Sequence, residues 1–102
     1  MSGFDVIIEA LRTNVALLKE AEEHWRDALD VVTANLLGPD DFGLLGKQDG
    51  IVLGCNEAAA NLELGLAQGA DNLRSAAEAL RAVADDQESR EREIVAQFKH
   101  LQ

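Results

Sequence analysis

Residues 8–36, with the sequence IEALRTNVALLKEAEEHWRDALDVVTANL, decide the fold of this protein. Their apolar side chains recur at alternating steps of three and four residues, and Glu22 fills the one gap in the series. The series consists of Ile8, Leu11, Val15, Leu18, Trp25, Leu29, Val32 and Leu36. A spacing that averages about 3.5 residues keeps one narrow stripe of a helix pointed at a neighbouring helix. The stretch therefore predicts a long amphipathic helix that packs against another helix.

Turn signals follow this helix directly. Gly38 suits the position just after a helix, and Pro39, the only proline of the chain, cannot continue one. We therefore predict helix one over about residues 4–35, a turn over about 37–43, and helix two over about 44–98. These elements form one domain that spans the whole chain.

Helix two is predicted from a second apolar series with the same alternating steps. Its members are Val52, Cys55, Ala59, Leu62, Leu66, Gly69, Leu73, Ala76, Leu80 and Val83. The pattern loosens at Gln87 and Arg90, and it resumes at Ile94, Phe98 and Leu101. The expected fold is all-α, an antiparallel helical hairpin of two long helices.

The two predicted helices differ in length. Both rise about 1.5 Å per residue, so the second helix extends about twenty residues beyond the end of the first. That extension still carries apolar side chains, which predicts that a partner covers them. We expect two hairpins to assemble into a four-helix bundle. The predicted partner contacts are Leu80, Val83, Ile94 and Phe98. The predicted facing residues, within one hairpin or between two, are Leu11, Val15, Leu18, Trp25, Leu29 and Val32 against Leu62, Leu66, Leu73 and Leu80.

Glycines recur every four residues at the start of helix two, at Gly46, Gly50 and Gly54, and again at Gly65 and Gly69. Small residues at this interval form a flat strip on which a second helix can pack closely, and each glycine costs roughly 1 kcal/mol of helix propensity against alanine. The alternative is that residues 46–54 form a loosely wound or broken entry to helix two.

Composition excludes several classes of partner. The net charge of −10 argues against nucleic acid and against anionic membrane surfaces, which bind clustered lysine and arginine. The sequence has no apolar run long enough to span a bilayer, and its first residues have no signal-peptide pattern. We therefore expect a protein partner, no membrane span and no removable leader.

Residues with possible chemistry are few. His24 lies among acidic residues, but the residue three before it is Ala21, so the Glu-x-x-His pattern of di-iron bundles is absent. Cys55 is the only cysteine, which suits a small side chain packed on a helix; an intermolecular disulfide is the alternative. We predict no enzyme activity, no metal and no cofactor.

Two residues of helix one depart from a simple apolar stripe. Glu22 can fix the pairing register if it meets a basic residue, with Arg74 and Arg81 as candidates, or its carboxylate can lie in water at the edge of the stripe. Trp25 is predicted to be an anchor buried in the core or in an interface. On that basis Trp25→Ala is expected to cost about 3–5 kcal/mol of stability.

Taken with these helices, the motif at residues 42–46, Phe-Gly-Leu-Leu-Gly, and the alanine- and leucine-rich run over residues 69–80 resemble the WXG100-like proteins of actinobacterial type VII secretion. The closer likeness is to the EspC-like (ESX-type) branch. The resemblance implies a small acidic hairpin that pairs with a related hairpin or a larger effector, as partner or adaptor of a secreted protein. It also implies export without a cleaved signal peptide, or a cytoplasmic location before export.

The chain departs from that family at two motifs. The Trp-x-Gly turn is missing, because Trp25 lies within helix one. The C-terminal Tyr-x-x-x-Asp/Glu export motif is degenerate, with Gln87 at the aromatic position and Glu91 at the acidic position. The chain therefore looks like an escorted partner rather than the bearer of the signal. The alternative function is a cytoplasmic helical-bundle dimerisation module without a role in secretion.

Overall fold

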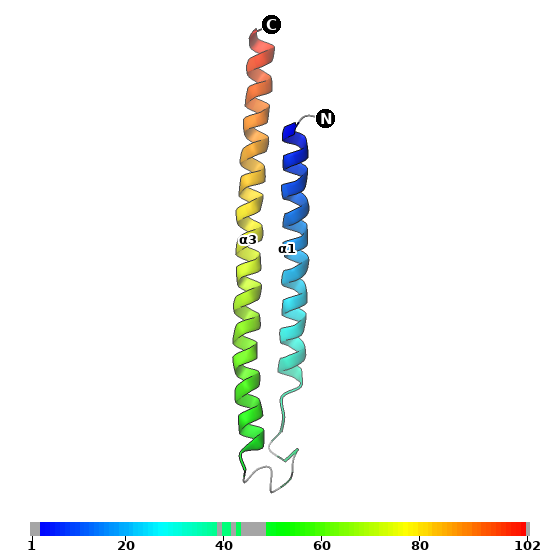
Figure 1. The fold of residues 1–102 in the computed structure, drawn as a ribbon, viewed down its shortest axis with the longest axis vertical. Coiled ribbons are helices and arrows are strands. Elements are labelled where there is room, and N and C mark those ends of the chain that lie inside the picture. Colours follow the sequence, from blue (N-terminus) through cyan, green and yellow to red (C-terminus); the bar gives the residue numbers. More distant parts are fainter. Residues whose placement is uncertain (1–2, 39, 42, 44–48, 102) are drawn as a thin grey trace. The chain divides into compact units, whose positions relative to one another are not determined.

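The computed structural model describes residues 3–38, 40–41, 43 and 49–101 of the chain. In this part, two long helices dominate: α1, Gly3–Ala34, and α3, Ile51–Leu101. They run antiparallel and pack against each other, which confirms the predicted all-α hairpin (Figure 1). None of the helices in the described residues is both long and apolar enough to cross a membrane.

The helices contribute to two compact units. One unit comprises residues Glu22–Asp71, with the second half of α1 and the first part of α3. The other comprises Met1–Ala21 together with Asn72–Gln102. Each unit therefore has its own antiparallel pair of helical segments, and each is described separately below.

The entry to the second long helix differs from the prediction. Asp49 and Gly50 form a turn, and α3 begins at Ile51 rather than near residue 44; residues 44–48 lie outside the described part. Gly50 has a φ of 71°, a left-handed conformation that glycine adopts without strain. Gly50 is therefore part of the break before α3, as in the alternative of a broken helix entry, and not part of a packing strip.

Hydrogen bonds join the segment after α1 to α3 within the unit Glu22–Asp71. The side-chain amide of Asn56 donates to the Leu37 carbonyl oxygen at 2.9 Å, and its own oxygen accepts from the Leu37 N–H at 3.1 Å. Asn35 Nδ2 donates to the Val31 carbonyl oxygen at 2.7 Å. The Asn35 bond satisfies a carbonyl that the end of α1 leaves without a partner in the helix, and the two Asn56 bonds join Leu37, three residues after α1 ends, to α3.

The buried residues of α3 are alanines seven residues apart. Ala70, Ala77 and Ala84 are 0%, 1% and 0% exposed, whereas the prediction had placed Gly69, Ala76 and Val83 at these contact positions. At these three levels the most buried residue of α3 therefore lies one position after the predicted one, although Gly69 still contacts α1.

Alanine has a short side chain, so a helix can approach α3 closely along this line and bury it completely. On α1, the buried residues are Ile8 and Val15. These belong to the apolar series predicted for helix one, so the displacement concerns α3 alone.

Candidate protein-interaction surface

Charge is divided between two sides of each helix. Residues seven apart lie on nearly the same side of a helix, because seven residues make about two turns. When α1 is divided into seven such positions, three of them hold no Asp, Glu, Lys or Arg from Gly3 to Asn35. In α3, four of the seven positions carry none from Ile51 to Val83. Each helix therefore has a charged side and an uncharged side over these ranges.

In the unit Glu22–Asp71, contacts between the helices show which sides lie together. Trp25 of α1 lies against Gly69 of α3, and both belong to uncharged positions. We call this surface the uncharged side of the unit. It includes Trp25, Ala28, Val31 and Val32 of α1 with Val52, Cys55, Ala58, Ala59, Leu62, Gly65, Leu66 and Gly69 of α3, and the same positions also hold His24, Asn35, Ile51, Gly54, Asn61 and Gln68.

The contact between Trp25 and Gly69 depends on the missing side chain of the glycine. A Cβ atom built on Gly69 would overlap the six-membered ring of the indole. Equivalent Cβ atoms on Gly54 and Gly65 would meet nothing within 4 Å. Among these glycines of α3, Gly69 therefore serves a close contact within the hairpin, whereas Gly54 and Gly65 leave open space.

The opposite side of this unit holds ion pairs. Arg26 Nη2 lies 2.6 Å from Glu22 Oε2 and 3.1 Å from Asp71 Oδ1, and the hydroxyl of Thr33 donates to Glu63 Oε2 at 3.3 Å. The hydrogen bond with Glu22, followed by that with Asp71, raises the pKa of the Arg26 guanidinium above its usual value. This side therefore joins the helices through partly exposed polar groups.

Glu22 occupies the gap in the apolar series of α1. Its side chain is 15% exposed, and its carboxylate pairs with Arg26 one turn later on the same helix. Arg74 and Arg81, the partners considered from the sequence, belong to the other unit. An ion pair at this spacing satisfies the half-buried carboxylate locally.

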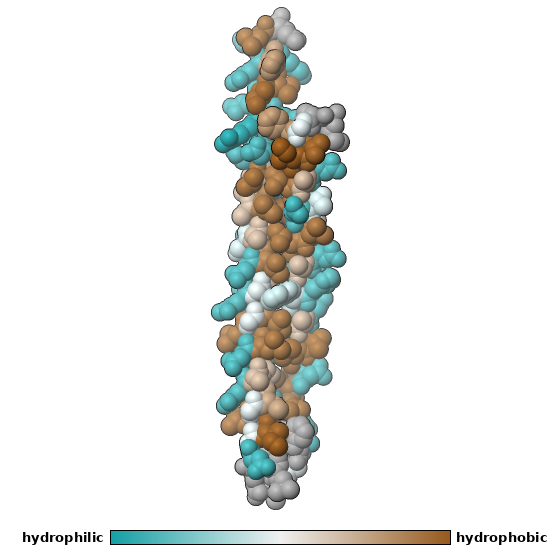
Figure 2. All heavy atoms as spheres, in the orientation of Figure 1, coloured by the Kyte–Doolittle hydropathy of each residue, from teal (hydrophilic) through white to brown (hydrophobic). Residues whose placement is uncertain are grey.

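Large apolar side chains remain exposed on the uncharged side. Val31 is 61% exposed, Leu62 is 52% exposed and Trp25 is 42% exposed. Figure 2 shows hydrophobic residues gathered on one face of α1 and α3, with hydrophilic residues towards its edges. Exposed apolar residues that lie together are typical of surfaces that bind another protein.

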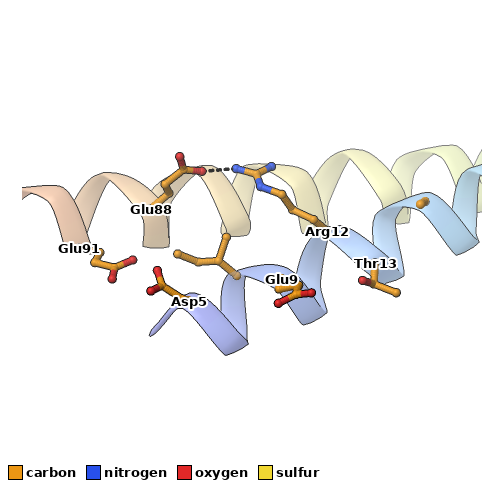
Figure 3. Close-up of a pocket in the computed structure, with 8 residues that line it drawn as sticks. Asp5, Glu9, Arg12, Thr13, Glu88 and Glu91 are labelled. Carbon is orange, nitrogen blue, oxygen red and sulfur yellow. Dashed lines mark hydrogen bonds and ion pairs between the residues drawn. The ribbon is translucent and has the colours of Figure 1, made fainter. Parts of the chain in front are cut away.

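The unit with the chain ends has its own ion pairs. Arg12 Nη2 lies 3.0 Å from Asp85 Oδ1 and also pairs with Glu88 (Figure 3). Hydrogen bonds with Glu88 and then Asp85 raise the pKa of the Arg12 guanidinium. The pair borders an open groove of about 620 Å³.

This groove is lined mainly by acidic and small residues, namely Asp5, Ile8, Glu9, Arg12, Thr13, Ala16, Glu88 and Glu91. In Figure 3 the side chains of Asp5 and Glu91 come from different helices and point towards the same space. Among the described residues, no group of three or more histidine, cysteine or acidic side chains is placed to hold a metal ion. The groove offers a salt bridge and carboxylates, but no arrangement with evident catalytic chemistry.

The residues predicted as sites fall into three classes of burial. Val15 is buried. The half-buried residues are Leu11, Leu18, Leu29, Val32, Leu66, Leu73, Leu80, Gln87 and Glu91. The exposed residues are Trp25, Leu62, Val83, Ile94 and Phe98. Cys55 is exposed, so the prediction of a small side chain packed on the helix was wrong for this residue, and His24 is exposed as well.

Sequence reasoning did not single out Asn56 or the buried alanines. The seven-residue spacing of the alanines could have indicated them. However, larger apolar residues, Leu62 and Val83, lie immediately before two positions of that line. Asn56 belongs to the same line, because it precedes Ala70 by two repeats. Choosing the larger of two adjacent apolar residues therefore selects Val83 rather than the buried Ala84.

The described residues thus form a two-helix antiparallel hairpin with an uncharged surface that the hairpin itself leaves partly uncovered. Such a surface is a candidate site for protein binding. Comparison of the chain with protein-family models, curated proteins and solved structures found no match.

Proposed function

We propose that this chain is an interaction protein that pairs with another helical protein, as partner or adaptor of a protein exported by actinobacterial type VII secretion. The observation that carries the proposal is the uncharged side of the hairpin with its exposed Trp25, Val31 and Leu62. Burial of apolar area on a partner is favourable by about 25 cal/mol per Å². The proposal assigns no catalysis and no cofactor.

The exposed area of the chain supports pairing. The chain exposes 7448 Å², whereas a compact protein of 11.0 kDa exposes about 5,600 Å². The difference is about 1,800 Å², and a standard protein interface buries about 800 Å² on each partner. Summed over the whole chain, the excess is larger than the area that one partner contributes to a standard interface.

A four-helix bundle is the arrangement we propose for the pair. A hairpin contributes two helices, and a second hairpin laid on the uncharged side surrounds apolar residues on both. Partly exposed residues such as Leu66 and Val32 would then lie in the interior of the bundle. Charged residues on the opposite side would stay in water.

The link to secretion depends on the resemblance to the WXG100-like and EspC-like proteins. Gln87 replaces the aromatic residue of the export motif, so we propose that a partner with an intact motif escorts this chain. Gln87 and Glu91 are both half-buried on α3. The chain would then wait in the cytoplasm until its partner brings it to the secretion machinery.

An export assay tests this part of the proposal. The tagged chain is expressed in an actinobacterial host with a type VII system, with and without the secretion ATPase, together with a hairpin that carries the intact motif. We expect the chain in the culture filtrate only when both the ATPase and the motif-bearing hairpin are present. Export without the ATPase, or no export under any of these conditions, would contradict the secretion role.

A restored motif makes the assay sharper. Gln87→Tyr creates Tyr-x-x-x-Glu with Glu91, whereas Gln97→Tyr adds the same side chain ten residues later without creating the motif. We expect Gln87→Tyr to be exported without the escort and Gln97→Tyr to remain in the cell. Equal behaviour of the two variants would remove the support for an escorted partner.

The second candidate function is a cytoplasmic helical-bundle dimerisation module. Gln87 at the aromatic position favours it, because the degenerate motif would then have no role. A neighbouring gene for a similar hairpin with Tyr-x-x-x-Asp/Glu would favour secretion. Retention of the protein in cells together with that hairpin would favour the module.

A further inference from the structure

We propose that the start of α1, residues 3–11, is a strap that detaches from α3 while the rest of the hairpin stays folded, and that Arg12 holds this strap closed. Detachment uncovers the part of α3 that carries Gln87 and Glu91. The importance of these two positions for export rests on the proposed function. The detachment itself is inferred from burial, charge and ion pairs within the unit with the chain ends.

Close packing between the helices of this unit stops near Ile8. On α3, Ala77 and Ala84 are 1% and 0% exposed, and on α1 Ile8 is buried. All of residues 3–7 are exposed. Seven residues after Ala84, the position that would continue the line of alanines holds Glu91 instead. The strap therefore has few buried apolar contacts, which is typical of segments that open locally.

The groove beside the strap is open and mainly acidic. It measures about 620 Å³, and its lining includes Asp5 and Glu9 of the strap with Glu88 and Glu91 of α3. Asp5 and Glu91 point towards the same space from different helices (Figure 3). Like charges that share a space repel each other, so this arrangement opposes close docking of the strap on α3.

Arg12 directly follows the strap and joins it to α3 by charge. Its Nη2 atom lies 3.0 Å from Asp85 Oδ1, and it also pairs with Glu88. The side chains of Arg12, Asp85 and Glu88 are 43%, 62% and 33% exposed, so the ion pairs remain partly hydrated. Ion pairs of this kind are weak and sensitive to salt. They hold the strap in place without preventing its opening.

The strap lies over the side of α3 that contains Gln87 and Glu91. Gln87 follows the half-buried Leu80 by seven residues, and Glu91 follows the buried Ala84 by the same interval. Both are half-buried, whereas Arg90 between them is exposed. Gln87 and Glu91 therefore belong to the side of α3 that faces α1, and they become accessible when the strap leaves.

Hydrogen exchange of the full chain measures opening of the strap. The amides of residues 7–11 are the reporters, because the first four amides of a helix have no bond within it. Arg12→Gln is compared with Arg26→Gln, since Arg26 also pairs with two carboxylates but lies in the other unit. We expect Arg12→Gln to accelerate exchange at residues 7–11 by about threefold or more, and Arg26→Gln to leave it unchanged.

Salt provides a second measurement that needs no substitution. In the unmodified chain, roughly 1 M sodium chloride should accelerate exchange at residues 7–11, because it screens the ion pairs of Arg12. The same salt should have much less effect on Arg12→Gln. Circular dichroism of each variant checks that the helices are retained.

Thiol labelling measures whether the strap covers α3. Cys55 is exposed and is first replaced, as Cys55→Ser. Gln87→Cys is then labelled with a maleimide, with Arg90→Cys at an exposed position as its control. We expect Arg12→Gln to accelerate labelling at position 87 by about threefold or more and to leave labelling at position 90 unchanged.

Four outcomes would overturn the inference: unchanged exchange at residues 7–11 in Arg12→Gln, equal acceleration there by Arg26→Gln, acceleration over the whole of α1, or unchanged labelling at position 87. Acceleration over all of α1 would mean that the hairpin opens as one body.

The export assay separates the strap from the proposed function. Arg12→Gln added to Gln87→Tyr should increase export without the escort, because the restored motif would be uncovered more often. The expected exchange and labelling with no export in any variant would reject secretion and keep the strap. Export of Gln87→Tyr with unchanged exchange in Arg12→Gln would reject the strap and keep the proposed function.

Discussion

Trp25 and Arg26 are neighbours in the sequence, but they join α1 to α3 on opposite sides and by different physics. Trp25 lies on Gly69, where any larger side chain would overlap it. Arg26 reaches Asp71 through an ion pair with side chains 37% and 59% exposed. The first contact depends on shape and removes apolar area from water, whereas the second stays largely hydrated and is therefore weak.

The two sides also differ in how much of their surface the hairpin leaves for a partner. The ion pairs of the charged side occupy groups of both helices, so that side is largely satisfied within the hairpin. The uncharged side keeps apolar residues exposed after the hairpin forms. Adjacent residues thus divide the surface into a side that faces water and a side suited to a protein partner.

Removal of Trp25 should give the largest change in stability. Its 42% exposure means that roughly half of a side chain of about 250 Å² is buried, so Trp25→Ala is expected to cost about 2–3 kcal/mol. This is less than the value expected for a fully buried anchor. Denaturation by urea at one protein concentration measures it, since dimerisation would make stability depend on concentration. A loss below about 1 kcal/mol would show that the contact with Gly69 is not maintained in solution.

Gly69→Ala should give the next largest change, with Gly54→Ala as its control. Alanine normally gains up to about 1 kcal/mol over glycine in a helix. At Gly54 nothing lies within 4 Å of the added carbon, so the gain should appear. At Gly69 the indole of Trp25 must move, and overpacking should turn the gain into a loss of about 1–2 kcal/mol. Equal stabilisation by the two variants would contradict the close contact.

Asn56→Ala tests the link between the end of α1 and α3. The two hydrogen bonds between Asn56 and Leu37 are partly buried, so their removal should cost about 1 kcal/mol. Asn61→Ala, at an exposed position of the same helix, is the control and should change the stability little. Thermal unfolding monitored by circular dichroism distinguishes them. If both variants unfold alike, the Asn56 bonds add nothing to the folded state.

The fold was predictable because α1 is specified by large residues. Adjacent apolar pairs also occur on α1, such as Ile7 with Ile8 and Val31 with Val32, but there the alternating series contains the member that the structure buries more, and Glu22 alone interrupts it. On α3, apolar residues occupy adjacent positions, such as Ala76 with Ala77 and Val83 with Ala84. Periodicity alone does not choose between two adjacent apolar residues, so at these levels of α3 the more buried residue lies one position after the predicted one.

The candidate surface was less accessible to prediction for the same reason. Leu62 was predicted to face helix one within or between hairpins and Val83 to contact a partner, and the structure leaves both exposed. The contact between Trp25 and Gly69 requires knowledge of which residues face each other across the hairpin, and no local pattern gives that. The start of α3 depended on the positive φ of Gly50, which a four-residue glycine spacing does not reveal.

Asp71→Asn should give the smallest change and completes the comparison. An ion pair between two such exposed side chains contributes little to stability, and roughly 1 M salt should remove most of that contribution. Removal of one negative charge from a chain of net charge −10 can itself stabilise the fold, so Asp27→Asn, at an exposed position of α1, provides the control for net charge. The double variant with Arg26→Gln isolates the coupling between Arg26 and Asp71. A coupling that persists undiminished in high salt would mean that the charged side is as important to the hairpin as the contact of Trp25, and the proposed division between the two sides would fail.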